Sequence, residues 1–260
     1  MYKVCMFNVY LGNLPHWIDF FVQSANFNKN YDFYIFNDKL ETEYNLGNVY
    51  FKKMTIDKIS EIISEKFNTK YQLKSIRKLC DWKTAYGRIF SEISENYDFW
   101  GHCDLDMIWG NISNFITESD YKKYDIISGD QNRLCGPFNL FKTANLTDVY
   151  NYNSSWQNIL FNLSHVAYDE FGLDVAIKSK YDKEKILYGM GSNNIPMQNY
   201  GSPSEQPPLR IPALWKEGDL TILEDERKTM FIHMGFKRSM KPTKFVEKNH
   251  FFIHKEGIKL

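Results

Sequence analysis

The chain has 260 residues, of which 43% are hydrophobic and 25% charged, a balance typical of a folded globular protein. It is long enough for one large domain or two small ones, and no uninterrupted apolar run approaches the ~20 residues that span a bilayer. Its 32 basic and 32 acidic side chains cancel, so net charge gives no argument for a nucleic-acid partner.

The N-terminal third alternates between strand-like and helix-like patterns. Residues 1–15 contain no cleavage signal and predict a first strand, at 2–10, rather than a signal peptide. Apolar residues at helical spacing predict a helix within 14–28, and a second aromatic-rich run predicts a strand at 31–38. Strand, helix and strand in this order build a parallel sheet. The elements expected next are a strand at 49–54, a helix at 55–67 with Thr55 as its N-cap, and a helix at 74–94.

The remaining sequence continues the mixed pattern. Its expected elements are strands at 97–103, 124–130, 138–143 and 229–238 and a helix at 154–164. Pro, Gly and Ser punctuate residues 193–212, which predicts a loop. The sequence therefore indicates a mixed α/β fold, a single domain with a decorated C-terminal part.

The stretch "YDFWGHCDLDMIWG", residues 97–110, sets two carboxylates into one of the most hydrophobic parts of the chain. Alternation places Asp104 and Asp106 on one side if the strand continues, or both at its carboxyl end if it stops. Ligands of open α/β sheets bind beyond that end, where two carboxylates repel each other unless a cation lies between them. The pair therefore predicts a Mg²⁺ or Mn²⁺ site that also binds a diphosphate. The alternative is a solvent-exposed turn, where Asp pairs are common.

Two histidines are candidates for a third metal ligand. His102 is at least as well explained as a hydrogen-bonded side chain on the other face of the strand. His233, in "FIHMGFKRSMK", follows a late apolar run and precedes Gly235 and Lys237. The imidazole could complete the metal shell, the glycine would let backbone approach a phosphate, and the lysine would neutralise its charge. Alone, His233 would more often be a packed or surface residue; the distant Asp pair favours the ligand interpretation.

These motifs resemble glycosyltransferases of the GT-A fold. The strand-end Asp-x-Asp is similar to that fold's metal–diphosphate motif. "HMGFK" is similar to the late His-x-x-Gly-x-x-Lys element of glycosyltransferase family eight, although the glycine here follows the histidine by two residues and the lysine by four. "KLCDWKTAYG…YDFWGHCDLD" resembles families eight and thirty-two and proteins of bacterial capsule and O-antigen loci. The resemblance covers the chain to about residue 142 and resumes near 233. It implies a GT-A-like, Rossmann-type mixed sheet flanked by helices.

The resemblance also implies roles for individual residues. Lys78 and Asp81 would lie near the nucleotide-sugar, although their spacing of three also suits a pair with each other. The residues implied to face the uridine of a UDP-sugar are Asn8, Tyr10 and Asp38. The residues implied to act on the donor sugar or its diphosphate are Asn139, Asp169 or Glu170, and Lys237. The competing interpretations are strand-end polar residues that satisfy turns and acidic residues that face water.

The function implied is transfer of a hexose from a UDP-sugar to a glycan acceptor in bacterial capsule or lipopolysaccharide O-antigen synthesis, with Mn²⁺ or Mg²⁺ as cofactor and retention of anomeric configuration. One alternative is a nucleotidyltransferase or phosphoesterase that uses the Asp pair, but these usually display a Gly-rich phosphate loop or further His and Asp clusters. Another is a non-catalytic carbohydrate-binding relative.

The chain end differs in composition from the rest. We expect a catalytic domain at 1–236 and a basic, aromatic tail at 237–260, where seven Lys or Arg face two Glu. The tail suits a peripheral contact with an anionic membrane that holds a lipid-linked acceptor, and equally a C-terminal helix whose phenylalanines pack on the domain. The four cysteines lack metal-ligand spacing, which predicts free buried thiols and a cytoplasmic location.

Overall fold

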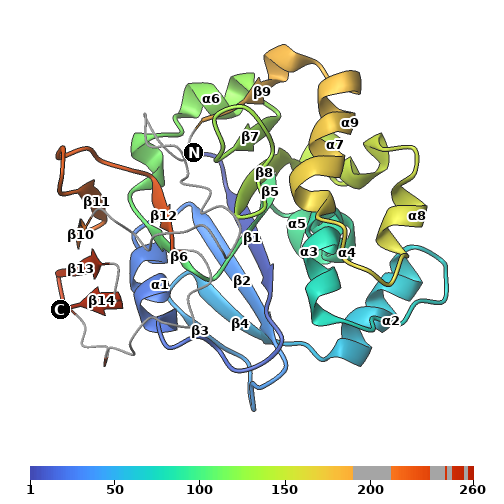
Figure 1. Cartoon of the computed structure of the whole chain (residues 1–260), viewed down its shortest axis with the longest axis horizontal. Coiled ribbons are helices and arrows are strands. Elements are labelled where there is room, and N and C mark those ends of the chain that lie inside the picture. The colour runs from blue at the N-terminus through green and yellow to red at the C-terminus, as the bar shows by residue number, and fades with distance from the viewer. Residues whose placement is uncertain (190–211, 235–243, 245–247, 255–256) are drawn as a thin grey trace.

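The structure is a computed structural model of the full chain, shown in Figure 1. It describes residues 1–189, 212–234, 244, 248–254 and 257–260. No helix in these ranges is both long and apolar enough to cross a bilayer.

A mixed eight-stranded sheet forms the centre of the fold. Its strands are β1 (Val4–Val9), β2 (Tyr31–Asn37), β3 (Tyr44–Leu46), β4 (Val49–Lys53), β5 (Phe99–Cys103), β7 (Ile126–Ser128), β8 (Phe138–Lys142) and β9 (Ile186–Leu187). Their spatial order is β3-β4-β2-β1-β5-β8-β7-β9. Strands β4, β2, β1 and β5 run parallel, whereas β8 is antiparallel to both of its neighbours. The predicted mixed α/β fold is confirmed.

Helices cover both faces of this sheet (Figure 1). They are α1 (Ile18–Ala25), α2 (Ile56–Lys66), α3 (Leu79–Trp82), α4 (Tyr86–Ile89), α5 (Ser91–Ser94), α6 (Glu118–Lys123), α7 (Thr143–Leu146), α8 (Trp156–Leu160) and α9 (Leu173–Lys180). In β1, Cys5 and Phe7 belong to the core shared with α2, α3, α4, α8 and α9, while Val4 and Met6 belong to the core shared with α1 and α6. This alternation makes β1 a strand buried on both faces, as its continuous apolar sequence predicts.

Two smaller sheets complete the fold. Strand β6 (Met107–Trp109) pairs antiparallel with β12 (Phe231–His233). The other sheet has the order β11-β10-β13-β14. Its strands are β10 (Ala213–Lys216), β11 (Asp219–Ile222), β13 (His250–His254) and β14 (Gly257–Lys259). Together these strands and α1 enclose a third core.

Residues 250–254 and 257–259 form strands, so the alternative of a C-terminal helix is wrong for these residues. Their phenylalanines do pack on the domain: Phe251 stacks on Trp215 at 4.8 Å between ring centroids and contacts the edge of Phe20 at 5.0 Å. Alternating burial of Phe251 and Ile253 explains the strand, since apolar residues two apart share one face.

Most predicted elements are confirmed, including the N-cap of α2, where the Thr55 side chain accepts a hydrogen bond from the Lys58 backbone N–H. The single helix expected at 74–94 is wrong. Short α and 3₁₀ turns replace it, and most residues from 78 to 94 are buried. At Gly87 a β-carbon would lie 2.4 Å from the Trp100 ring, so the glycine permits close contact with β5.

Two further expectations have mixed outcomes. The loop predicted at 193–212 lies, except for residue 212, outside the described residues. The cysteines are free, as predicted; Cys5, Cys103 and Cys135 are buried, while Cys80 is only half-buried.

Candidate active site

Asp104 and Asp106 flank a turn at the carboxyl end of β5, on the edge where β1 and β2 also end. The Asp104 N–H donates to the Pro137 carbonyl at 3.2 Å. Between the two carboxylates, Leu105 is buried, and its carbonyl accepts a hydrogen bond from the Trp17 indole at 2.9 Å. Both carboxylates line the same cavity. Strand β5 ends at Cys103, so the first of the two expected geometries, a strand that continues through both residues, is wrong.

His233 reaches the pair through β6 and β12. The register of these strands sets His233 opposite Met107, and the Met234 N–H donates to the Asp106 carbonyl at 2.7 Å. The imidazole Nε2 then lies 3.2 Å from Asp106 Oδ1 and 3.7 Å from Asp104 Oδ2. One potential ligand atom from each of the three residues lies within 4.8 Å of the others, so the three can bind one ion.

The charges of this cluster depend on each other. Burial opposes ionisation of Asp106, but the facing His233 outweighs it and holds the Asp106 pKa below its ordinary value. Burial would likewise lower the pKa of His233, but the carboxylates of Asp106 and Asp104 raise it instead. In the metal-free protein, therefore, the two carboxylates favour the imidazolium form of His233, whose positive charge lies where a cation would bind.

Lys83 is a buried cation beside the cluster that the sequence interpretation missed. Its Nζ lies 2.6 Å from Asp104 Oδ1, 3.5 Å from Asp169 Oδ2 and 2.9 Å from the Gly136 carbonyl. Burial would lower the Lys83 pKa, but the two carboxylates outweigh it and raise that pKa well above its ordinary value. The sequence feature that could have indicated its burial is its position four residues after Leu79, on the apolar face of the predicted helix.

Asp169 lies on the same cavity, in the turn Tyr168–Gly172 that precedes α9. Burial outweighs the attraction of Lys83 and raises the pKa of the Asp169 carboxyl to about 7. Glu170 lines the cavity beside it. The site thus contains ionised carboxylate at Asp106 and a carboxyl group at Asp169 that exchanges its proton near neutral pH.

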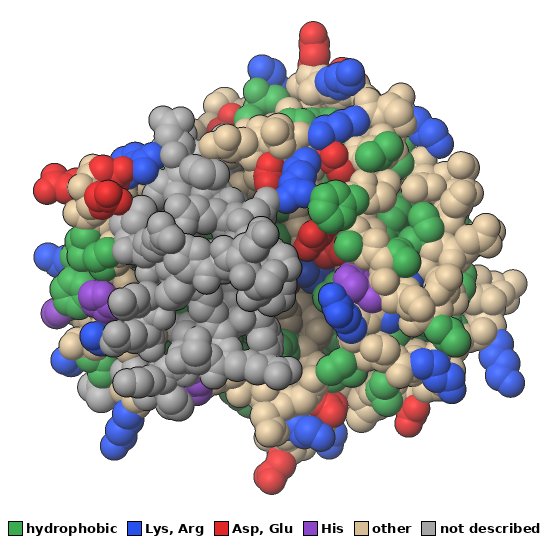
Figure 2. Space-filling view, viewed as in Figure 1, with side chains coloured by type: hydrophobic (Ala, Val, Ile, Leu, Met, Phe, Trp, Pro, Cys, Tyr) green, Lys and Arg blue, Asp and Glu red, His purple; other side chains and the backbone are tan. Residues whose placement is uncertain are grey.

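All these groups line one cavity of about 770 Å³. In Figure 2, acidic, basic and histidine side chains gather around a hollow near the middle of the view. The further lining residues are Asn8, Val9, Tyr10, Leu11, Pro15, Trp17, Ile76, Arg77, Leu79, Cys80, Tyr86, Leu105 and His165. The Asn8 Nδ2 donates to the Cys103 carbonyl, whereas its buried Oδ1 has no partner among the described residues. That oxygen is available to a ligand.

The comparisons with known proteins give a family. The model of a family of unknown function, DUF6625, matches residues 6–259. The chain belongs to this family. Among curated proteins, none matches the chain.

Solved structures similar to this DUF6625 member include three glycosyltransferases. Galactosyltransferase LgtC, in complex with donor and acceptor sugar analogues, is 12% identical, with a TM-score of 0.41, over 72% of this chain and 73% of LgtC. Mouse xyloside xylosyltransferase 1 is 9% identical, with a TM-score of 0.43, over 72% of this chain and 84% of the mouse protein. GlyE of Streptococcus pneumoniae TIGR4 is 9% identical, with a TM-score of 0.40, over 72% of this chain and 45% of GlyE.

The structure does not bring every predicted residue of this DUF6625 member to the cavity. Lys78 and Asp81 form a fully buried pair at 2.8 Å, the alternative that their spacing allowed, and neither lines the cavity. Asp38 accepts a hydrogen bond from the Gly12 N–H at 2.6 Å and also does not line it.

Asn139 and His102 lie deeper in the fold. Asn139 is buried, and its Nδ2 lies 3.2 Å from His102 Nε2 and donates to the Cys135 carbonyl at 2.6 Å. Neither residue lines the cavity. Gly235 and Lys237 lie outside the described residues.

Proposed function

We propose that this protein is a metal-dependent glycosyltransferase, which transfers a hexose from a UDP-sugar to a glycan acceptor. The observation that carries the proposal is the cluster of Asp104, Asp106 and His233 on the wall of a cavity large enough for a nucleotide-sugar. The sequence resemblance to GT-A glycosyltransferases supports it.

The three side chains fit a divalent cation. Two carboxylates and one imidazole suit Mn²⁺, and Mg²⁺ accepts the carboxylates with water at its remaining positions. The exposed fractions of 28% for Asp104, 10% for Asp106 and 24% for His233 leave room for ligands from the cavity side. When bound, such an ion supplies Lewis-acid chemistry, because it neutralises the charge that develops on a leaving diphosphate.

The chain's own residues would position the reacting groups. Lys83 fixes Asp104 by a short ion pair and adds positive charge next to the proposed diphosphate position. Asp169 and Glu170, on the same cavity, are placed to contact the transferred sugar, whose anomeric carbon becomes oxocarbenium-like as the bond to UDP breaks. We propose that the reaction retains anomeric configuration, and we assign no nucleophile.

Further roles follow from the resemblance. Asn8 and Tyr10, which line the cavity, would face the uridine, and Lys237 with Gly235 would approach the diphosphate. The process would be synthesis of capsule or lipopolysaccharide O-antigen, with a lipid-linked glycan as acceptor. The exposed basic side chains of the tail, 237–260, such as Lys244 and Lys248, would then contact the cytoplasmic face of the membrane.

A thermal-shift experiment tests the proposal. UDP with Mn²⁺ should raise the melting temperature of the wild type by several degrees, because a hundredfold excess over Kd stabilises by about 2.7 kcal/mol. UDP without metal should raise the melting temperature much less. Asp106→Asn should abolish the metal-dependent part, whereas the control Asp225→Asn, at an exposed carboxylate paired with Arg227, should retain it.

Each other result has a definite meaning. A wild type that does not respond to UDP with Mn²⁺ or Mg²⁺ contradicts the UDP-sugar proposal. Stabilisation by ATP or CTP in place of UDP favours a nucleotidyltransferase. If UDP with metal does stabilise the wild type, hydrolysis of one member of a panel of UDP-sugars would identify the donor.

A further inference from the structure

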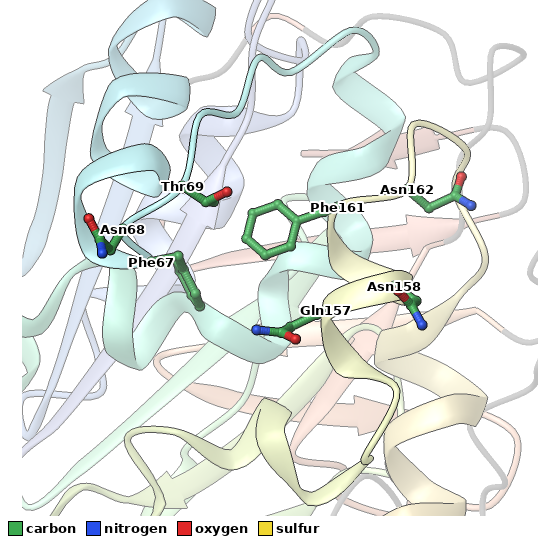
Figure 3. Close-up of a pocket in the computed structure, with 7 residues that line it drawn as sticks. All are labelled: Phe67, Asn68, Thr69, Gln157, Asn158, Phe161 and Asn162. Carbon is green, nitrogen blue, oxygen red and sulfur yellow. The ribbon is translucent and has the colours of Figure 1, made fainter.

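A second cavity lies between the C-terminal end of α2 and helix α8 (Figure 3). Its volume is about 510 Å³, within the range of small-molecule sites. The residues that line it are Phe67, Asn68, Thr69, Gln157, Asn158, Phe161 and Asn162. None of them lines the first cavity, so the two cavities are separate sites.

The lining is neutral but rich in side-chain amides. These amides are exposed at the rim of the cavity: among the described residues, the side chains of Asn68, Gln157 and Asn158 have no protein hydrogen-bond partner, and Asn162 uses its Oδ1 alone, accepting from the Ser164 N–H at 2.8 Å. Each free amide offers two donors and an acceptor, which match hydroxyl groups that both donate and accept. A phosphate or carboxylate would find no cationic side chain in this lining. The chemistry favours a neutral, polyhydroxylated ligand.

Two aromatic rings lie between the amides (Figure 3). Phe67 and Phe161 lie edge to face at 6.0 Å between centroids, and both pack against Trp82, at 5.3 and 5.5 Å. These contacts restrict the rings to one arrangement. A half-buried aromatic surface flanked by amides suits a pyranose, which has apolar C–H faces and a rim of hydroxyls.

The backbone also holds Asn68 in position. Its φ of 47° lies in the left-handed region, where asparagine is tolerated better than most residues. The next residue, Thr69, donates its N–H to the Ser64 carbonyl at 3.0 Å, which closes the end of α2. The turn therefore fixes the backbone of Asn68 at the rim of the cavity, where its side chain is exposed.

We infer that this second cavity binds a neutral pyranose unit of a glycan. Asn162 lines it and His165 lines the first cavity, so at most about 11 Å of extended chain separates the two residues. A glycan acceptor of several sugars is long enough to contact both cavities. Sugar binding itself does not depend on the transferase proposal; only the role as an acceptor subsite rests on it.

Saturation-transfer NMR of the full chain, without metal, tests the inference. The probes are methyl β-galactoside, methyl α-glucoside and maltotriose at millimolar concentration. At least one probe should receive saturation from the wild type, and the signal should persist when UDP and Mn²⁺ are added, because they bind in the other cavity.

Three variants make the test specific. The double variant Gln157→Ala, Asn158→Ala should bind roughly tenfold more weakly through the loss of two or more hydrogen bonds. Asn68→Gly, which keeps the left-handed backbone, should bind a few-fold more weakly. The control Asn114→Ala removes an exposed amide elsewhere and should bind as the wild type does. No signal from any probe, or equal signals from wild type and double variant, would overturn the inference. Neither outcome bears on the UDP thermal shift.

Discussion

Two clusters that each contain acidic and basic side chains lie close together in this protein. They differ in how many of their hydrogen-bonding atoms already have a partner within the protein. The buried pair, Lys78 and Asp81, is saturated. Lys78 donates to the carbonyls of Ile159 and Ser164, at 2.7 and 3.0 Å, in addition to Asp81. Asp81 also accepts from the backbone N–H groups of two residues in the segment between α8 and α9, Val166 and Tyr168.

The open cluster, Asp104, Asp106 and His233, faces a cavity and leaves carboxylate oxygens available to ligands. The difference shows that charge and burial alone do not indicate function. A saturated pair joins two chain segments, whereas an unsaturated cluster on a cavity can bind an ion. Substitutions should therefore separate the two clusters: one should change stability and the other ligand binding.

The largest expected effect on stability is that of Asp81→Ala. The change leaves Lys78 as an unpaired buried charge and removes the acceptor for two backbone N–H groups. It should lower the free energy of unfolding by about 3–5 kcal/mol, measured by urea denaturation. The control Asp57→Ala, at an exposed carboxyl on α2, should change it by less than about 1 kcal/mol. An equal, small effect of both substitutions would mean that Asp81 does not join the two segments.

The same contrast explains what the sequence could predict. Asp104 and Asp106 were located correctly at the end of a strand, because the apolar run and its interruption are local features. The Lys78–Asp81 pair was predicted only as an alternative, because its burial comes from residues 159–168, far along the chain. Local spacing does not reveal which chain segment will cover a helix.

His233 and Lys83 illustrate the two kinds of long-range information. The proximity of His233 to Asp106 depends on the pairing of β6 with β12, more than a hundred residues apart, so the sequence could suggest it only from the residue types around His233 and from the distant Asp pair. Lys83 lay on an apolar helical face, where a lysine usually extends to solvent. Here ion pairs with Asp104 and Asp169 hold the Lys83 side chain inside the protein, and these two partners come from other segments of the chain.

We expect Asp169→Asn to have an intermediate effect on the free energy of unfolding, and this effect should depend on pH. Burial raises the pKa of Asp169 from 3.8 to about 7 in the folded protein, so between these values the folded state retains a proton that the unfolded state has lost. The contribution of this carboxyl to stability is therefore largest at low pH and is lost as pH rises towards 7, with a slope of at most about 1.4 kcal/mol per pH unit.

Urea denaturation at several pH values, in the presence of a chelator, measures this slope. The wild type should lose stability between about pH 4 and 7 relative to Asp169→Asn. Asp57→Asn again serves as the exposed control and should follow the wild type. Parallel curves for wild type and Asp169→Asn would contradict a protonated Asp169, and would mean that Lys83 keeps this carboxyl ionised.

The smallest effect is expected where the two clusters meet, at His165. Its ring lines the first cavity, while its Nδ1 lies 3.1 Å from Asp81 Oδ1 in the buried pair. His165→Ala should lower the free energy of unfolding by only about 1 kcal/mol, because Asp81 keeps Lys78 and two backbone donors.

If the two clusters are independent, His165→Ala should also retain the rise in melting temperature with UDP and Mn²⁺, since all three residues of the open cluster remain. Loss of that response, despite a small change in unfolding free energy, would show that the His165 ring, which lines the cavity and contacts Asp81, links the buried pair to nucleotide binding. In that case the two clusters could not be separated into a structural pair and a ligand-binding cluster. Lys78 and Asp81 would then contribute indirectly to donor binding, in the region where the sequence resemblance placed them.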